Sequence, residues 1–244
     1  MAAKKKPASG GNSKFLGALA VVVLGGGGAI AWVLSNSGAT SVALDPNAPP
    51  PAPAGYVIGS PDAPVEVIEF ADFECPGCAH FATLTAPDVK ARLVASGQAR
   101  FRFVDFPLVD IHPNSLAAHN AAACANEQGK FWEMHDKLFY GQADWSAQGT
   151  SSPGRLLKGY AKDLALDTDA FNRCLDSRKY QAQIDANLAE GRRLGVGGTP
   201  TMIIGSRMIF TRMSYDVVKA YVDSAAADVA AGRAGSRFGQ PSGE

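Results

Sequence analysis

The sequence predicts an α/β protein that carries an inserted all-helical lobe and is preceded by an N-terminal transmembrane helix. Three observations predict this fold class. Residues 15–34 contain no charged side chain. From residue 64, a strand pattern, a Cys-x-x-Cys and a helix pattern follow one another. Residues 112–193 then show helical periodicity with almost no strand signal, which is too long a stretch for a loop.

The charges are unevenly distributed along the 244 residues. The chain has 23 basic and 23 acidic residues, yet every charge before residue 45 is a lysine: Lys4, Lys5, Lys6 and Lys14. This balance excludes a strongly basic nucleic-acid-binding protein. The hydrophobic fraction of 46% excludes a chain that is mostly disordered. We therefore expect a folded domain joined to a short basic N-terminus (1–14).

The uncharged stretch at residues 15–34, FLGALAVVVLGGGGAIAWVL, is long enough to cross a bilayer core of about 30 Å. A cleaved signal peptide is the alternative, because the four glycines at 25–28 weaken the helix. The lysines before it favour a cytoplasmic N-terminus. The prediction is a single-pass protein of the bacterial cytoplasmic membrane whose folded domain faces the extracytoplasmic or periplasmic side, an oxidising compartment.

A Pro-rich linker is expected at residues 35–55. Five prolines fall between Pro46 and Pro53, and such a run favours an extended spacer over a packed core. A PxxP docking site is the less favoured interpretation, since no basic or aromatic anchors flank it. The folded domain is then placed at 56–233, followed by a disordered tail at 234–244.

The first half of the domain predicts a strand, a helix and a second strand. Residues 64–70 (PVEVIEF) are apolar and β-branched. Residues 76–96 have helical spacing, with a kink expected at Pro87 and an end at Gly97. Residues 99–106 (ARFRFVDF) alternate charged residues and aromatic rings, as in a strand with one solvated face.

The second half predicts the helical insertion and a terminal hairpin. The insertion at 112–193 is expected to hold four or five helices. Residues 201–204 and 207–211 are two short apolar runs around Gly205-Ser206, which is a two-residue hairpin signal. Ser214 is expected to cap a last helix that ends near residue 231.

The CPGC motif is the main candidate for chemistry. Cys75 is expected at the N-terminus of a helix, where unpaired N–H groups and the helix dipole lower a thiol pKa below its usual value of roughly 8.5. Pro76 suits the first helical turn, and Gly77 allows close approach of a substrate. Cys78 lies one turn further on, so Cys75 is predicted to attack and Cys78 to resolve.

Three other interpretations of CPGC are weaker. Zinc needs a second pair of ligands, which the sequence does not offer. Covalent haem needs a histidine directly after the second cysteine, but that position is Ala79 and the histidine is His80. A purely structural disulfide would close a ring too small to stabilise the fold much.

Two further features accompany the cysteines. Glu69 precedes Cys75 on the predicted strand, where a partly buried carboxylate would exchange protons with Cys78; a solvated residue is the alternative. Asp72 and Glu74 are expected to face water. The segment GVGGTPT places Thr199-Pro200 at a strand entrance, where the spacing alone leaves a cis bond open.

Together, FECPGC (73–78), CANEQGKFWEMHDKLF (124–139) and GVGGTPT (195–201) resemble the DsbA-like thiol:disulfide oxidoreductases of the thioredoxin superfamily. The resemblance covers roughly residues 56–231 and implies a thioredoxin fold. It also implies that Thr199-Pro200 is cis and packs on the active-site disulfide. Glu69 would match the family's buried carboxylate, and the helical insertion would cap the fold beside a peptide groove.

One position departs from the best-known strong oxidases of the family, which carry a histidine between the cysteines. Here that position is Gly77. Less stabilisation of the thiolate means a weaker oxidant. We therefore predict a reduction potential more reducing than that of a CPHC enzyme.

Cys124 and Cys174 form a second pair, fifty residues apart in the insertion. We expect a structural disulfide, because exported proteins seldom leave thiols free; two separate buried thiols are the alternative.

The remaining aromatic residues and histidines point to packing. His112 and His119 are expected at helix entries or on the surface, and His135 on an amphipathic helix face. No metal site is predicted, and Phe131, Trp132 and Phe139 are expected in the core.

The resulting hypothesis is a membrane-tethered protein disulfide oxidoreductase that needs no cofactor beyond the Cys75–Cys78 disulfide. Its expected partners are unfolded or cysteine-containing exported proteins and a DsbB-like or VKOR-like membrane redox protein; no nucleic acid is expected. A reductase or isomerase, for example in cytochrome maturation, and a non-catalytic subunit of a membrane complex are the alternatives.

Overall fold

The computed structural model describes residues 41–44, 55–210 and 213–233. The predicted basic tail, transmembrane helix and C-terminal tail, and most of the predicted linker, lie outside the described residues. Among the described helices, none combines the length and the apolar character needed to span a bilayer.

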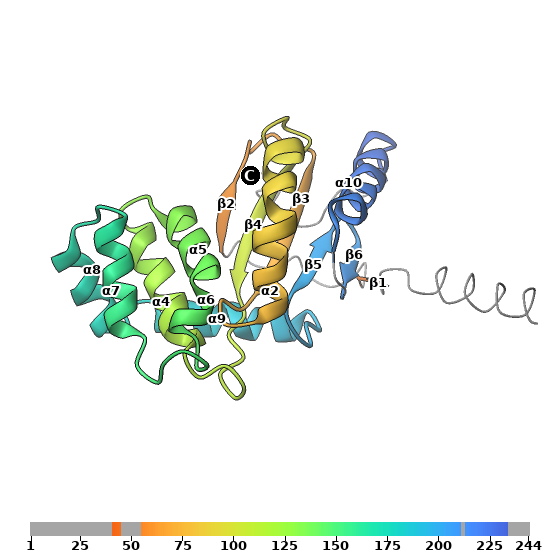
Figure 1. The fold of residues 1–244 in the computed structure, drawn as a ribbon. Helices are drawn as coiled ribbons and strands as arrows, with labels where there is room; N and C mark the ends of the chain where they lie inside the picture. The colour runs from red at the N-terminus through yellow and green to blue at the C-terminus, as the bar shows by residue number, and fades with distance from the viewer. Residues whose placement is uncertain (1–40, 45–54, 211–212, 234–244) are drawn as a thin grey trace, which may run out of the picture. The chain divides into compact units, whose positions relative to one another are not determined.

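A mixed six-stranded sheet forms the centre of the described domain (Figure 1). Its strand order is β1-β6-β5-β3-β4-β2. The strands are β1 (Ser41–Ala43), β2 (Tyr56–Ile58), β3 (Val65–Ala71), β4 (Ala99–Asp105), β5 (Thr201–Ile204) and β6 (Arg207–Ile209). β3 and β4 run parallel, and the other neighbours run antiparallel. The two strands of the predicted strand, helix, strand unit are therefore β3 and β4, which lie next to each other inside the sheet.

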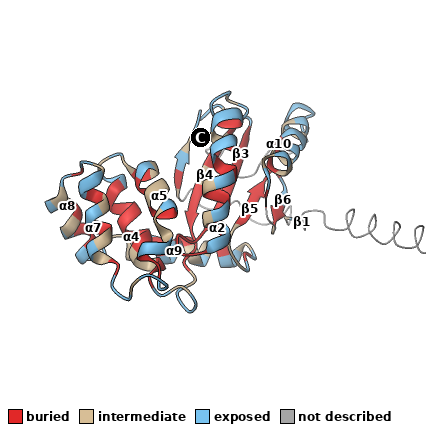
Figure 2. Ribbon diagram, in the orientation of Figure 1, coloured by how far each residue is buried: buried red, intermediate tan, exposed pale blue. Residues whose placement is uncertain are grey.

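The central strand β3 is buried along its whole length, as Figure 2 shows. Its side chains alternate between two faces. On one face, Ile68 and Phe70 pack in a cluster that Leu188 of α9 (Gln181–Arg193) also contacts. On the other face, Ala71 belongs to a cluster with Cys78 of the first described helix. Both faces are therefore covered, which explains why every residue of β3 is buried, Glu66 and Glu69 included.

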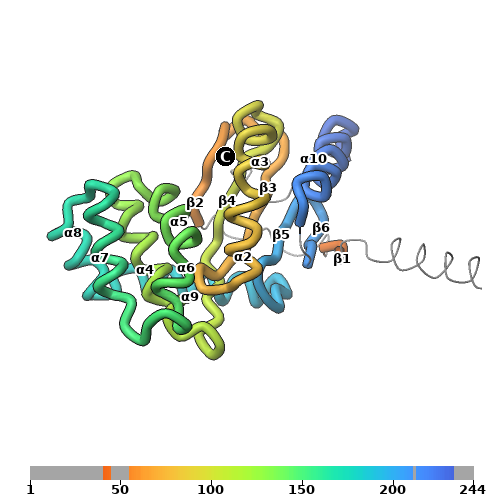
Figure 3. Tube along the Cα trace, viewed as in Figure 1, coloured from red at the N-terminus to blue at the C-terminus, as the bar shows by residue number. Residues whose placement is uncertain are grey.

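The helix after CPGC runs from Pro76 to Val94 as one rod beside β3 and β4 (Figure 3). It consists of α2 (Pro76–His80), α3 (Ala86–Val89) and a wide π turn after each, at 81–85 and 90–94. In the first wide turn the Ala86 amide bonds to the Phe81 carbonyl, five residues back. Pro87 follows at once, and the wide turn accommodates its ring and its missing N–H. A π turn therefore lies directly before Pro87, and the helix continues through the position where a kink was predicted.

The C-terminal part adds the hairpin β5–β6 and helix α10 (Tyr215–Ala230). Gly205 adopts φ +57° in the hairpin turn, a conformation that favours glycine. Ser214 caps α10 by accepting a bond from the Val217 amide at 3.4 Å. The Thr85 hydroxyl bonds to the Met213 carbonyl at 2.9 Å, which holds the start of α10 beside the long helix.

The insertion contains more helices than predicted. Residues 112–193 form six helical segments: α4 (Ser115–Asn126), α5 (Phe131–Tyr140), α6 (Gln142–Trp145), α7 (Gly154–Asp163), α8 (Thr168–Asp176) and α9. α6 is a single turn, too short to produce periodicity in the sequence. α9 packs on the sheet, so we use the name helical lobe for residues 112–180, which contain α4 to α8.

Part of the predicted linker belongs to the folded domain. Ser41–Ala43 pair with β6 as the edge strand β1, and the Leu44 amide bonds to the Ser206 carbonyl at 2.9 Å. These residues precede the proline run, and each has a backbone N–H group that a proline would lack, so they can pair as a strand of the sheet.

Candidate active site

The turn from β3 into α2 places the two CPGC cysteines beyond the carboxyl end of a central strand. Cys75 is the N-cap of α2 with extended backbone angles, and Pro76 occupies the first turn. Both thiols are free. Cys75 is 8% exposed and Cys78 is fully buried, so the two sulfurs lie in different environments although one helical turn separates them.

The surroundings of Cys75 favour its thiolate. A hydrogen bond with the Cys78 thiol, which outweighs the opposing effect of burial, and the N–H groups of Cys78 and Gly77 lower the pKa of Cys75 to about 5. In the thiol form, Sγ of Cys75 donates to the Thr199 carbonyl at 3.4 Å. The buried Thr199 hydroxyl has no partner among the described residues, so it is available to donate to the thiolate.

Cys78 and Glu69 are held in their protonated forms. Burial, together with the neighbouring Cys75 and Glu69, raises the pKa of Cys78 well above its usual value. Glu69 is 1% exposed, and burial raises its pKa to about 8. One of its oxygens has no hydrogen-bond partner among the described residues. Glu69 is therefore buried, not solvated, and carries a proton at neutral pH.

Thr199-Pro200 packs beside the cysteines and its peptide bond is cis. A Cβ built on Gly77 would lie 3.2 Å from Cδ of Pro200 and 3.6 Å from Sγ of Cys75. A side chain at position 77 would therefore lie between the cis-proline and the sulfur of Cys75. Pro76, Gly77, Thr199 and Pro200, all predicted as supporting residues, are brought together around Cys75.

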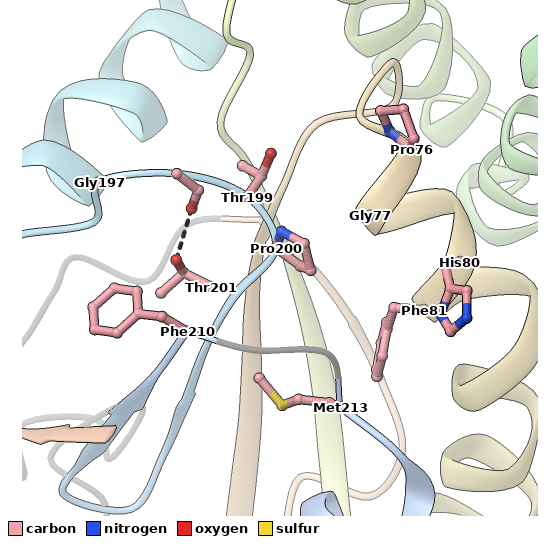
Figure 4. A pocket seen from close by; sticks show the side chains of 11 residues that line it. Pro76, Gly77, His80, Phe81, Gly197, Thr199, Pro200, Thr201, Phe210 and Met213 are labelled. Atoms are coloured by element: carbon pink, nitrogen blue, oxygen red, sulfur yellow. Dashed lines mark hydrogen bonds between the residues drawn. The ribbon is translucent and has the colours of Figure 1, made fainter. Parts of the chain in front are cut away.

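A cavity of about 600 Å³ opens next to this cluster (Figure 4). Its walls come from α2 and the π turn after it, from the loop 197–201, and from the chain after β6. Pro76, Pro200, Phe81, Phe210 and Met213 make the walls largely apolar, and His80 is the one titratable residue among those that line it. None of the lining residues belongs to the helical lobe. The size and apolar walls of the cavity suit an extended peptide that contains a cysteine with apolar residues next to it.

The prediction that Asp72 and Glu74 face water is wrong. Asp72 is fully buried, and Glu74 is 5% exposed. Asp72 accepts bonds from the Leu108 amide at 2.8 Å and from the Ser115 hydroxyl at 2.5 Å. Glu74 accepts bonds from backbone amides of the lobe. A buried carboxylate is stable when it is hydrogen-bonded, and here the partners come from distant segments that the sequence pattern does not reveal.

The prediction for His119 is also wrong, because this residue is buried inside α4, whereas His112 lies at the entry to α4 as expected. Both histidines pair with buried carboxylates. His112 Nδ1 lies 2.8 Å from Asp72, and the side chain is only 15% exposed. His119 is fully buried with Nδ1 2.6 Å from Asp105, which also accepts a bond from Asn187 at 2.8 Å. His135 is buried as well, and burial lowers its pKa to about 4. Long-range partners, absent from a linear pattern, determine these placements.

The aromatic residues of α5 pack as expected. Phe131 and Phe139 are each 3% exposed, and Trp132 packs partly buried against the same cluster. Within the described residues, no group of three or more His, Cys, Asp or Glu side chains is arranged to hold a metal ion.

Cys124 of α4 and Cys174 of α8 are joined by a disulfide with an S–S distance of 2.01 Å. Both residues are almost fully buried in the lobe. This bridge closes a 50-residue separation and links the first and last helices of the lobe.

Comparison with known proteins identifies the family. The model of a family described as thioredoxin matches residues 52–224, most of the chain. The chain belongs to the thioredoxin family. Within it, the chain is DsbA-like: the oxidised crystal structure of BdbD from Bacillus subtilis matches with a TM-score of 0.64 and 26% identity, covering 76% of this chain and 97% of that one. α-DsbA1 from Wolbachia pipientis matches with a TM-score of 0.66 at 21% identity, which supports the fold alone.

Curated relatives of this thioredoxin-family chain include two kinds of protein. Disulfide bond formation protein D of Bacillus subtilis is 27% identical over 168 residues, which are 68% of this chain and 75% of that protein. The Na(+)/H(+) antiporter NhaA 1 of Salinispora arenicola is 36% identical over 170 residues, or 70% of this chain. The chain spans about a quarter of that antiporter's length, 24%, and 27% of NhaA 3 of Salinispora tropica.

The protonation of Glu69 predicts a pH-dependent effect of Glu69→Gln. Glu69 ionises near 4.5 in an unfolded chain and near 8 in the folded one. Between these pH values the folded protein keeps a proton that the unfolded chain releases, so its stability falls as pH rises. The amide removes this dependence. In denaturant titrations, the unfolding free energy of the variant relative to that of the wild type should increase from pH 4.5 to about 8. A difference between the two proteins that stays constant over this pH range would contradict the prediction.

Proposed function

We propose that this chain is an extracytoplasmic protein disulfide oxidoreductase that forms or exchanges disulfides in exported proteins. The observation that carries the proposal is the unequal environment of the two CPGC thiols. Cys75 lies beside an apolar cavity with its thiolate stabilised, whereas Cys78 is fully buried next to protonated Glu69. Disulfide exchange needs this asymmetry, since one sulfur must receive the substrate and the other must resolve.

The reaction in the oxidising direction follows from these environments. A substrate thiolate attacks Sγ of Cys75, the Cys75–Cys78 bond breaks, and Cys78 leaves as a thiolate. Because the pKa of Cys78 is high and Glu69 holds a proton, Glu69 is placed to protonate it. The second substrate thiolate then attacks the substrate sulfur of the mixed disulfide. Cys75 leaves as a stable thiolate, so the substrate gains a disulfide and the enzyme becomes a dithiol.

The cellular setting is part of the same proposal. The uncharged stretch 15–34 after a lysine cluster supports an N-terminal membrane anchor with the catalytic domain on the extracytoplasmic side. The lobe disulfide is compatible with an oxidising compartment. Turnover as an oxidase requires reoxidation of the dithiol, and a DsbB-like or VKOR-like membrane protein would accept its electrons.

Two assays run side by side test the activity. The full chain is expected to accelerate the refolding of a reduced protein with several disulfides when a glutathione redox buffer regenerates it. Insulin reduction by dithiothreitol should also be accelerated. Acceleration of insulin reduction alone would assign a reductase, and no acceleration in either assay would reject an enzyme in favour of a binding subunit.

The glycine between the cysteines predicts a change in redox equilibrium. Gly77→His would place a cationic ring near Sγ of Cys75, 3.6 Å from the new Cβ, and stabilise the thiolate. The variant's disulfide should therefore oxidise glutathione more strongly than the wild type, by about tenfold for each unit by which the Cys75 pKa falls. Gly77→Ala has the same contact with Pro200 but no charge and is the matched control. If the equilibrium with glutathione shifted equally in Gly77→His and Gly77→Ala, the prediction would be contradicted.

A further inference from the structure

The backbone around the nucleophile is held by a side chain of the helical lobe. Gln142, the first residue of α6, donates from Nε2 to the carbonyl of Phe73 at 2.7 Å and to the carbonyl of Cys75 at 3.1 Å. The Cys75 carbonyl also accepts the first bond of α2, from the Ala79 amide at 3.1 Å. Gln142 therefore binds the peptide group from which α2 begins.

A second contact joins the same lobe segment to the residue between Phe73 and Cys75. The buried carboxylate of Glu74 accepts a bond from the Asn114 amide at 2.7 Å and one from the Ala147 amide at 2.5 Å. Asn114 in turn donates from its side chain to the carbonyls of Trp145 and Thr150. The chain that follows Gln142, at residues 145–150, is thus also fixed to the segment 73–75, directly through Glu74 and indirectly through Asn114.

We propose that Gln142 is a positioning residue for Cys75, through which the docked lobe sets how strongly the thiolate is stabilised. The inference rests on the proposed function and extends it. The lobe would influence the reactivity of Cys75 although none of its residues lines the cavity. Nothing in the sequence pattern distinguishes Gln142 from a surface glutamine.

The physical reason lies in the direction of backbone N–H groups. The amides of Gly77 and Cys78 point toward Sγ of Cys75 because α2 begins at that residue in one fixed orientation. Gln142 fixes the carbonyls on either side of Glu74. Without these bonds the start of α2 has more freedom, the amides are less well directed, and the thiolate is less stable.

Two substitutions in the full chain separate positioning from a merely structural role. Gln142→Leu keeps the size of the side chain but removes both donors. Gln142→Glu keeps its shape but presents a carboxylate to two carbonyl oxygens and adds a negative charge near the sulfur. Gln148→Leu, the same change at an exposed position of the following loop, is the matched control.

The measurements are the ultraviolet titration of the Cys75 thiolate and the equilibrium with glutathione. We expect Gln142→Leu to raise the Cys75 pKa and to weaken the oxidant by about threefold to tenfold, the size of one or two hydrogen bonds. Gln142→Glu should shift both quantities further in the same direction, and Gln148→Leu should shift neither.

One result would overturn the proposal. If both Gln142 variants titrate and equilibrate like the wild type, Gln142 only stabilises the lobe, even if denaturant unfolding shows a loss of stability. The thiolate titration needs no substrate, so this outcome is distinct from failure of the proposed function, which would appear as a wild-type protein inactive in both exchange assays.

Discussion

Cys75→Ser is expected to abolish disulfide exchange, reducing the rate of insulin reduction and of oxidative refolding to the level without protein. The reason is that Cys75 is the sulfur with a stabilised thiolate beside the cavity, whereas Cys78 is fully buried and held protonated. A serine hydroxyl is a far weaker nucleophile at neutral pH and cannot form a disulfide. Initial rates of both assays, measured against equal amounts of wild type, test this prediction.

Cys78→Ala provides the complementary result. In the reducing direction, the Cys75 thiolate of this variant attacks a substrate disulfide and displaces one substrate thiolate. Because no Cys78 is present to resolve the product, Cys75 should remain bound to substrate in mixed disulfides, which non-reducing gels and mass spectrometry detect. Substrate adducts on Cys78 in the Cys75→Ser variant, with none on Cys75 in Cys78→Ala, would mean that Cys78 attacks and Cys75 resolves, the reverse of the proposed order.

Removal of the lobe disulfide should cost the most stability. A Cys124→Ala/Cys174→Ala variant frees a loop of 50 residues, for which chain entropy predicts a loss of about 4 kcal/mol in the free energy of unfolding. Denaturant unfolding measures this loss, with the m-value as a check on the unfolded state. The Cys75–Cys78 pair should be reduced under milder conditions than the lobe pair, because Cys75 lies beside the cavity and leaves as a stabilised thiolate, whereas both lobe sulfurs are buried away from it. A loss below about 1 kcal/mol would show that the lobe is held by packing alone.

The sequence predicted those features that depend on neighbouring residues. The order of β3, the helix after it, β4, the helical insertion, the β5–β6 hairpin and α10 followed from periodicity and turn signals, whereas the short strands β1 and β2 were not predicted. The position of Cys75 at a helix start followed from the CPGC spacing and Pro76. Thr199 and Pro200 could be placed beside the cysteines because the resemblance to a known family supplied the long-range pairing.

The side-chain placements that escaped prediction depend on contacts between distant segments. Asp72 and Glu74 look like solvated acids beside a motif, yet the lobe provides donors that bury them. His119 lies among alanines in α4 and becomes a buried partner of Asp105 only when α4 packs against the end of β4. The contact of Gln142 with the Cys75 carbonyl spans 67 residues and has no local signal at all.

These contacts explain how one motif yields two different thiols. The Cys78 thiol and the amides at the helix start stabilise a negative charge on Cys75, while the sheet behind it buries Cys78 and Glu69 away from water. The first effect is local and the second requires the whole domain. Disulfide exchange as proposed depends on both, because a Cys78 thiolate as stable as that of Cys75 would give the substrate no preferred sulfur.

The titration of the Cys75 thiol in the reduced protein tests this asymmetry most directly. Its rate of alkylation, measured as a function of pH in wild-type and Cys78→Ala protein, should rise with a midpoint near 5 in the wild type and at a higher pH in the variant, whose alanine has no donor for the thiolate. The Cys78 thiol should remain unreactive until well above pH 9.0. A wild-type Cys75 that titrates near 9.0, like an ordinary thiol, would contradict the account.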